Sequence, residues 1–484
     1  MNGYNQYPRV NSDHHGSGDR TVTDNYYLKI GGTEFLRAEV IAELSSTDAE
    51  TKKKAEGVLS EKLKETRVRV GTLLKTDNVS FLIGAGASMK AGGIGLASIP
   101  LELEKALHEK AQAAAAGEDT SWLSLFYETV SKLSGQAFDL TARRQALTGD
   151  LAPVQKIPYN LEDYLSRLHI WLAGMQAFAA SATLNLGADV TLAMSEDRVA
   201  RLIREINRSL TSLTNLPVNG KEDSLTDHRR LIKKVLTRPL NLRRANLFTL
   251  NYDTLIEKAA DAEGAVLVDG FVGTLRRIFR PESYDLDFYF PAQTTEGRVH
   301  RFDRALHLYK LHGSITWHRC DADWENPYGL YATFYKQEAP EDDVQIYPSP
   351  LKYGQALGLP YSELFRRFGS AIAQPQSVLF AIGYGFGDEH VNAIIRQALA
   401  IPSFTLVVVD PAPTSDFVGH LKQLGDERVW LVSGSQLGTF EHFVERLLPD
   451  LREEEITTKV MKTYKALASA AQHDDAIPEN PGDN

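Results

Sequence analysis

The sequence predicts an α/β protein with a doubly wound parallel β-sheet and a large helical insertion. Several short apolar runs lack polar alternation, which is typical of parallel strands buried on both faces. Helical patterns alternate with these runs in the second half of the chain, as parallel strand connections require. Between about residues 101 and 240 the pattern is almost wholly helical, so we expect this segment to be an insertion into the sheet domain.

Polar segments flank the expected sheet domain. Residues 1–25 lack an apolar core, which predicts a disordered tail and not a secretory signal. Apolar positions recur at helical spacing in 26–75, an expected N-terminal helical segment. The sheet domain is expected over 76–448, followed by a C-terminal helix and acidic tail over 449–484.

Six apolar runs are the predicted strands. The first is "VSFLIG", which follows a helix exit at Lys75-Thr76-Asp77. The other predicted strands are 246–253, 306–315, 377–385, 404–411 and 428–434.

Within the insertion, the weakly polar run from Ile170 to Met194 is interrupted by polar residues, so it predicts a buried or partner-facing helix and not a membrane span.

Composition limits the possible functions. The chain has 484 residues, 43% of them hydrophobic and 24% charged, so it is long enough and apolar enough for a large core. A net charge of -10 gives no basic field for direct nucleic-acid binding. The single Cys320 excludes an intrachain disulfide and a multi-cysteine zinc site, and it fits a cytoplasmic protein. We expect no bound metal.

A glycine-rich turn follows the first predicted strand. Five glycines fall within twelve positions in "GAGASMKAGGIG", from Gly84 to Gly95. Such a turn lets backbone N–H groups approach a pyrophosphate near a helix N-terminus. The alternative is that the glycines serve tight packing. The spacing does not match G-x-G-x-x-G, because Met89 stands where that motif has its third glycine. An ordinary Rossmann dehydrogenase is therefore not the natural interpretation.

Polar residues also end three later strands. They occur in "TLNYD" (249–253), "KLHGS" (310–314) and "IGYGFGDEHVN" (382–392). The carboxyl ends of parallel strands meet at one edge of the sheet, so we expect these groups to converge on one pocket.

Together these motifs resemble the sirtuin family, specifically its prokaryotic branch associated with NAD hydrolysis in anti-phage defence. The family's G-A-G-x-S, T-x-N-x-D and histidine-glycine motifs occur here in the same order. "HGS", "GYGFGDEHVN", "NLEDYL" (160–165) and "IYPSPLKYGQALGLPYSELFRRF" (346–368) look like the defence branch. The resemblance covers roughly 76–440 and implies a sirtuin-type Rossmann-like sheet.

The chain departs from protein-deacylating sirtuins in three ways. The Asp-Phe-Arg sequence is missing after Gly95, Leu250 stands where those enzymes usually have glutamine, and the four-cysteine zinc module is absent. These departures weigh against acyl-lysine chemistry and leave NAD binding and cleavage intact.

The resemblance implies a role for each motif residue. Asn251 would orient the ribose and a water, His312 would act as the base, and Asp253 would hold the nicotinamide carboxamide. Ser88 and the glycine turn would hold the phosphates. Gly383 and Asp410, at the ends of two later strands, would contact the adenosine half. The implied catalytic residues are Asn251 and His312, and the implied NAD-binding residues are Gly84, Ala85, Gly86, Ser88, Thr249, Asp253, Gly313, Ser314, Gly383 and Asp410.

Structural alternatives stand beside these roles. Asn251 could cap the helix that begins near Asp253, and His312 could be a buried structural histidine. We interpret Asp388 as a helix N-cap rather than a catalytic group. Arg366 and Arg367 fit a solvated helix face better than a phosphate clamp.

The expected function is NAD hydrolysis to nicotinamide and ADP-ribose, in anti-phage defence by NAD depletion. The alternatives are an NAD-dependent protein deacylase and a non-enzymatic NAD- or ADP-ribose-binding scaffold in a defence complex. The resemblance implies gating by assembly, with a homo-oligomer and a separate partner such as a HerA-type ATPase translocase. An apolar stripe at 202–213 is expected to meet another copy or a partner, unless it packs within the insertion.

Overall fold

The computed structural model describes residues 25–463, with several gaps. The predicted N-terminal tail, the acidic C-terminal end and most of the motif at 346–368 lie outside the described residues. The gaps are 37, 96–97, 116, 139, 149–156, 179–181, 186–190, 217–221, 291–299, 334–359, 457–458 and 461.

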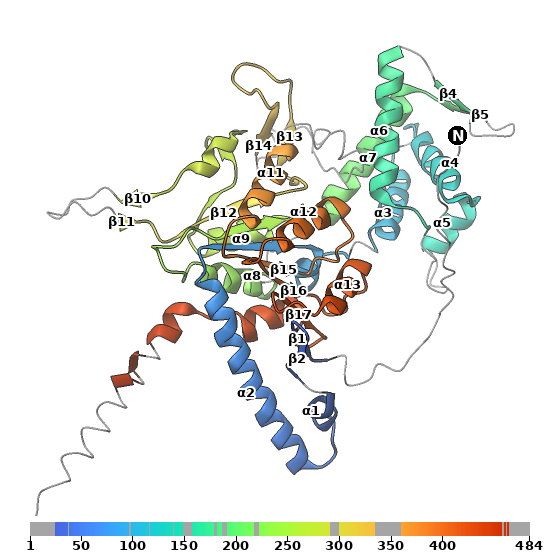
Figure 1. Ribbon diagram of the computed structural model, residues 1–484. Coiled ribbons are helices and arrows are strands. Elements are labelled where there is room, and N and C mark those ends of the chain that lie inside the picture. The colour runs from blue at the N-terminus through green and yellow to red at the C-terminus, as the bar shows by residue number, and fades with distance from the viewer. Residues whose placement is uncertain are drawn as a thin grey trace, which may run out of the picture.

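A nine-stranded sheet forms the centre of the molecule (Figure 1). Its strand order is β2-β1-β17-β16-β15-β3-β6-β12-β7, and the strands from β17 to β7 run parallel. The prediction of an α/β protein with a parallel central sheet is confirmed. The bounds are β3 Asn78–Ile83, β6 Asn246–Thr249, β7 Val266–Val268, β12 Ala305–Lys310, β15 Ser377–Ile382, β16 Thr405–Val409 and β17 Val429–Ser433.

Alternate residues of each strand point to opposite sides of the sheet. Both faces are apolar here, and helices cover both of them. In β3, Phe81 and Ile83 join one apolar core, whereas Leu82 joins the other. The first core is closed by α2 (Ala49–Leu74), α8 (Glu222–Val235), α9 (Leu255–Ala262), α14 (Phe440–His442) and the following turn Phe443–Leu447. The second is closed by α11 (Tyr361–Ile372), α12 (Glu389–Leu399) and α13 (Asp416–Leu424).

Two segments differ from the sequence prediction. The segment 26–75 contains not only α1 (Ala38–Glu43) and α2 but also β1 (Tyr27–Ile30) and β2 (Thr33–Glu34), which extend the sheet antiparallel to β17. The single helix expected from Ile170 to Met194 is wrong. Helix α6 (Leu161–Phe178) ends first, and β4 (Ala182–Asn185) pairs with β5 (Thr191–Met194). Gly187 and Asp189, between these strands, are turn-forming residue types.

A second, four-stranded sheet was not predicted. Its order is β13-β14-β9-β8, and it packs in the same core as α11 and α12. Strands of two or three residues are too short to show a periodicity. The bounds here are β8 Phe271–Val272, β9 Arg277–Phe279, β13 Trp317–Arg319 and β14 Leu330–Ala332, and a separate hairpin joins β10 (Tyr289–Phe290) to β11 (His300–Arg301).

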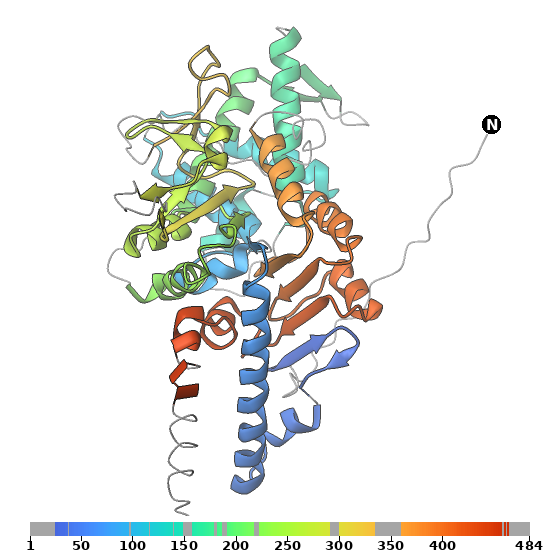
Figure 2. The same ribbon diagram turned by 60° about the vertical axis from the view of Figure 1, so that its left-hand side comes forward.

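The helical insertion has a core of its own, built by α3 (Ile99–Ala113), α4 (Ser121–Ser134), α6 and α7 (Glu196–Thr214), with α5 (Leu140–Thr148) beside them. Figure 2 shows it at the opposite end of the molecule from the outer end of α2. Helix α8, expected within the insertion, covers the central sheet instead.

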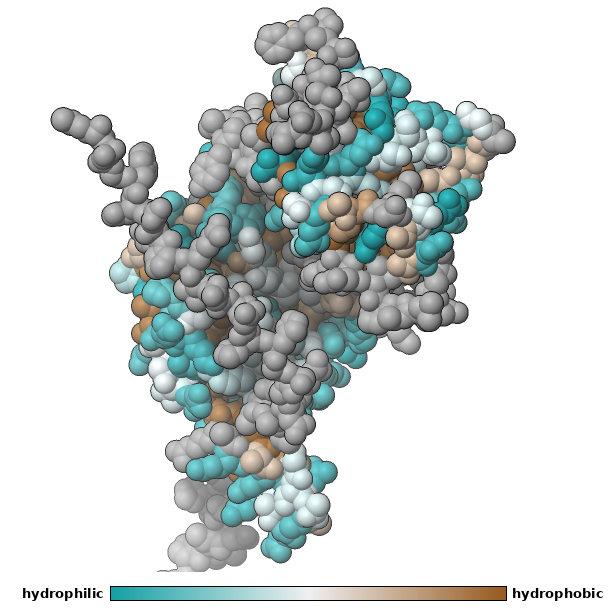
Figure 3. All heavy atoms as spheres, turned by 90° about the vertical axis from the view of Figure 1, so that its right-hand side faces the viewer, coloured by the Kyte–Doolittle hydropathy of each residue, from teal (hydrophilic) through white to brown (hydrophobic). Residues whose placement is uncertain are grey.

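The apolar stripe on α7 packs inside this insertion core. Leu202, Ile203, Ile206 and Leu210 are 0 to 5% exposed, and Leu213 packs against them. The alternative interpretation of this stripe is therefore the right one, and it is not a free docking face. On the face in Figure 3, hydrophobic residues occur in small separate groups among hydrophilic ones. Among the helices described, none has the length and apolar character needed to cross a membrane.

The glycine turn after β3 packs against a second glycine turn, after β15. A Cβ added to Gly84 would lie 2.5 Å from the Gly383 carbonyl oxygen, and one on Gly86 would lie 2.7 Å from the Gly383 Cα. Gly383 itself has a φ of +61°. The element that approaches the glycine turn so closely is therefore the chain's own backbone.

Replacing Gly383 by alanine should destabilise the protein by at least about 2 kcal/mol, because the new Cβ combines a left-handed φ with a clash. The added Cβ would lie 2.7 Å from the Ala87 nitrogen. Gly385→Ala is the matched control, since a Cβ there meets nothing within 4 Å. Urea unfolding of both variants measures the difference, and equal stabilities would contradict the packing argument.

Candidate functional site

The predicted site residues gather at the carboxyl edge of the central sheet. After β3 the chain continues through β6 on one side of β3, and later returns to β15 on its other side. The strand order thus reverses between β3 and β15, which is where open α/β sheets form their ligand crevice. The ends of β3, β6, β12 and β15 supply the residues of the site.

Asn251 ties the end of β6 to the glycine turn. The Thr249 hydroxyl donates to the Ile83 carbonyl (3.0 Å) and accepts from the Asn251 N–H (3.0 Å). The Asn251 side-chain NH₂ group donates to the Gly84 carbonyl and to the Ser88 hydroxyl oxygen, both at 3.0 Å. Asn251 therefore does not cap the following helix.

Ser88 and Asp253 extend the same hydrogen-bond network. The Ser88 hydroxyl donates to Asp253 Oδ2 at 2.6 Å, and Asp253 Oδ1 accepts from the Leu255 N–H at 3.0 Å. Asp253, which precedes the N-cap residue Thr254, thus accepts from the first N–H of α9. Both Ser88 and Asp253 are largely buried, at 4% and 9% exposure. The motifs of β3 and β6 consequently form one ordered polar cluster.

The glycine turn uses two of its own N–H groups to hold β15. Gly84 N–H donates to the Ile382 carbonyl (3.0 Å) and Gly86 N–H to the Gly383 carbonyl (2.9 Å). These two donors are engaged within the protein. The packing alternative for the glycines therefore has direct support, and phosphate binding here would depend on other groups.

His312, which follows β12, contacts Asp388, which follows β15. Its Nε2 lies 3.1 Å from Asp388 Oδ2, and the imidazole is 7% exposed. The other carboxylate oxygen, Asp388 Oδ1, accepts from the His390 and Val391 N–H groups at the start of α12. Asp388 is therefore an N-cap, as expected, and also the carboxylate partner of His312. With the proton of Nε2 donated to Asp388, the imidazole lone pair lies on Nδ1.

A buried ion pair supports the Asn251–Asp253 loop from below. The Lys310 ammonium is 2.9 Å from Glu257 and also donates to the Asp253 carbonyl. Burial raises the pKa of Glu257 above its usual range, although Lys310 opposes this shift. Burial also lowers the pKa of His228 to about 4, partly offset by Asp253, so this neighbouring imidazole is neutral at pH 7.

Four other residues of the predicted site make packing, turn or local hydrogen-bond contacts. Ser314 is fully buried and accepts from Thr316, and Gly313 turns the chain with a φ of +93°. Gly383 packs against the glycine turn. Asp410, at the end of β16, accepts from the Ala412 N–H, and burial raises its pKa.

Sequence reasoning missed Lys310 and Glu257, and it missed the pairing of Asp388 with His312. A lysine at the end of a largely apolar strand, two residues before His312, was the available signal. Among the described residues, no group of three or more His, Cys, Asp or Glu side chains is arranged to hold a metal ion.

Comparison with known proteins identifies one region. Residues 245–423 match the family model of the SIR2-like domain, so a SIR2-like domain is found there. The match includes Asn251, His312 and Asp388 and begins after the glycine turn. No curated protein matches the chain.

Proposed function

We propose that this chain is an NAD hydrolase, whose active site is the polar cluster at the carboxyl edge of the sheet. SIR2-like domains are often NAD-dependent enzymes, and the match covers β6 to α13. The observation that carries the proposal is the convergence of Asn251, the Ser88–Asp253 pair and the His312–Asp388 pair at the strand-order reversal. These groups follow four strand ends on the edge of the sheet at which open α/β sheets bind nucleotides, which supports the proposal.

The reaction needs a positioned sugar, a water and a base. A water oxygen bonds to C1′ of the nicotinamide ribose while the C1′–N bond breaks, and the electron pair of that bond neutralises the departing nicotinamide. The water proton passes to His312, held by Asp388, and then to solvent. Asn251, whose NH₂ group is fixed by Gly84 and Ser88, presents its amide oxygen to the ribose or the water.

Regulation would act through the insertion. Tyr252, between Asn251 and Asp253, packs against the insertion core, as does Ile315 after the His312 turn. A movement of the insertion would therefore shift both catalytic loops. We propose that assembly, with copies of this chain or with a partner such as a HerA-type ATPase translocase, gates cleavage in anti-phage defence.

Product analysis tests the proposal. The purified chain, alone and with its partner, should convert NAD to nicotinamide and ADP-ribose, and Asn251→Ala should lower the rate at least about a hundredfold. Chromatography resolves the products, and circular dichroism checks the fold. Activity that appears only with an acyl-lysine peptide would favour a deacylase, whereas NAD binding without turnover in the complex would favour a scaffold.

A further inference from the structure

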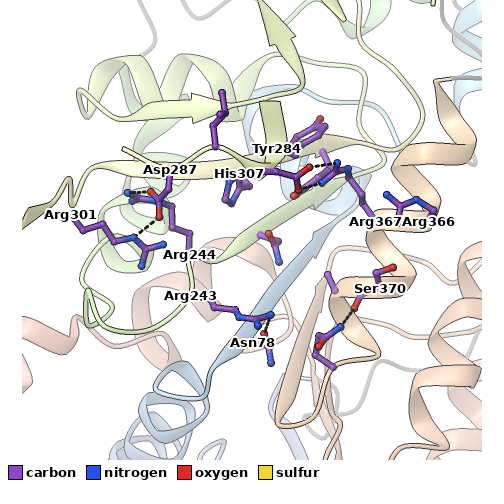
Figure 4. A pocket seen from close by; sticks show the side chains of 16 residues that line it. Asn78, Arg243, Arg244, Tyr284, Asp287, Arg301, His307, Arg366, Arg367 and Ser370 are labelled. Atoms are coloured by element: carbon purple, nitrogen blue, oxygen red, sulfur yellow. Dashed lines mark hydrogen bonds and ion pairs between the residues drawn. The ribbon is translucent and has the colours of Figure 1, made fainter. Parts of the chain in front are cut away.

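A separate pocket lies at the amino edge of the central sheet. Its volume is about 600 Å³, and it is lined by the starts of β3 and β6, by His307 of β12 and by the second half of α11 (Figure 4). The candidate active site lies at the other end of these same strands. The two sites therefore do not overlap, and ligand binding in this pocket does not depend on the proposed function.

Arginine dominates the charge of this pocket. Five guanidinium groups line it, and Asp285 and Asp287 are the carboxylates among its lining residues. Glu363, just outside, pairs with two of the arginines. Five positive charges against three negative ones leave a surplus of two. The arginines are Arg243, Arg244, Arg301, Arg366 and Arg367.

Most of these arginines are held in fixed positions. Arg367 makes two bonds to Asp285, at 2.9 and 3.0 Å, and Arg244 bonds Asp287 at 2.6 Å and the Ala305 carbonyl at 3.0 Å. The Arg244 side chain is only 5% exposed. Such bonds orient guanidinium groups before a ligand arrives, which lowers the entropic cost of binding.

Arg243 is the arginine with unused capacity. Within the described part of the chain it has no carboxylate partner, and its guanidinium reaches only the Asn78 side-chain oxygen, at 3.4 Å. Arg366, on the facing helix, is 60% exposed and pairs with Glu363. Both side chains border the cavity in Figure 4. Both side chains can therefore reorient toward a bound anion while the backbone that lines the pocket stays in place.

His307 is the residue that lines the pocket from the middle of β12. Burial and the nearby Arg244 lower the pKa of this imidazole to about 4, with Arg301 acting in the same direction. Asp287 opposes this effect without cancelling it. The Nε2 atom of His307 is buried and has no hydrogen-bond partner among the described residues.

We propose that this pocket binds a phosphate-bearing small molecule of about mononucleotide size. Guanidinium forks match phosphate oxygens in geometry and charge, and a single phosphate can bridge several of them. The cavity volume lies within the range of about 300–1,000 Å³ that small-molecule sites occupy. A ligand here would contact β12 at His307, and His312 follows the end of that strand, five residues along the chain.

Calorimetric titration of the full chain with inorganic pyrophosphate and with AMP tests the proposal. We expect saturable binding of both, weakened at least about tenfold in an Arg243→Ala/Arg366→Ala double variant, since two charge-assisted bonds to the anion are lost. Arg452→Ala is the matched control, because this exposed arginine pairs with Asp303 outside the pocket. Its affinity should equal that of the unmodified chain.

Several results would overturn the proposal. Absence of saturable binding at millimolar ligand, or equal binding by the double variant, would do so. Sulfate or citrate binding as tightly as both phosphate ligands would make the pocket a general anion site. Binding that survives in the double variant and disappears in Asn251→Ala would place the anion in the candidate active site. NAD turnover, measured in parallel, should remain in the double variant, so the two proposals can fail separately.

Discussion

His312→Ala is expected to lower NAD hydrolysis by at least about a hundredfold, the scale typical of removing a positioned acid–base group. The imidazole is 7% exposed and lies against the Asp388 carboxylate, so it is held in one orientation. The rate is measured as nicotinamide release at saturating NAD. Thermal unfolding of the variant verifies that the fold is intact.

Asp388→Asn separates the positioning role from the capping role. Asparagine caps helices as well as aspartate, so the free energy of unfolding should change by no more than about 0.5 kcal/mol. The rate should nevertheless fall about tenfold or more, because a neutral amide stabilises the imidazolium formed by proton transfer less than the carboxylate does. Ser415→Ala, at the N-cap of α13, is the control that loses a cap without losing activity. Full activity in both His312→Ala and Asp388→Asn would exclude this pair from catalysis.

Lys310→Met is expected to lower the free energy of unfolding by about 3 kcal/mol, since removing one partner leaves a buried charge uncompensated. The Lys310 side chain is 4% exposed and that of Glu257 is 14% exposed, and one Glu257 oxygen already lacks a hydrogen-bond partner among the described residues. The same change removes the ammonium donor to the Asp253 carbonyl, so the loop from Asn251 to Asp253 also loses a support. Urea unfolding measures the loss.

Two further variants serve as controls for the unfolding measurement on Lys310→Met. Lys62→Met breaks an exposed pair with Glu65 and should cost less than about 1 kcal/mol. The double variant Lys310→Met/Glu257→Leu should recover much of the lost stability, because it leaves no unpaired charge. A Lys310→Met variant as stable as Lys62→Met would show that the pair contributes nothing.

The strands of the central sheet could be predicted because they are continuously apolar. The strand beginning at Asn78 was found almost to the residue, but those beginning at Asn246 and Ala305 were drawn too long. Their polar ends, at Asn251 and His312, belong to loops that are held by hydrogen bonds to residues following other strands. Periodicity within one segment contains no information on such bonds.

The residues of the candidate site could be predicted better than the hydrogen bonds between them. Strand-end polar residues identified Asn251, Asp253 and His312, but the bond from His312 to Asp388 spans 76 positions. The glycine turn poses the same problem. A sequence shows that something must approach Gly84 and Gly86 closely, and only the fold shows that it is the Gly383 backbone.

The position of β3 has a consequence for modularity. This strand lies between β6 and β15, yet it precedes the SIR2-like region by the whole insertion. A fragment limited to 245–423 would lack the strand that joins its two halves, leaving β6 and β15 as unpaired apolar edges prone to aggregation. The SIR2-like region therefore does not form a complete folding unit by itself. A recombinant protein that carried this region would also need the strand Asn78–Ile83.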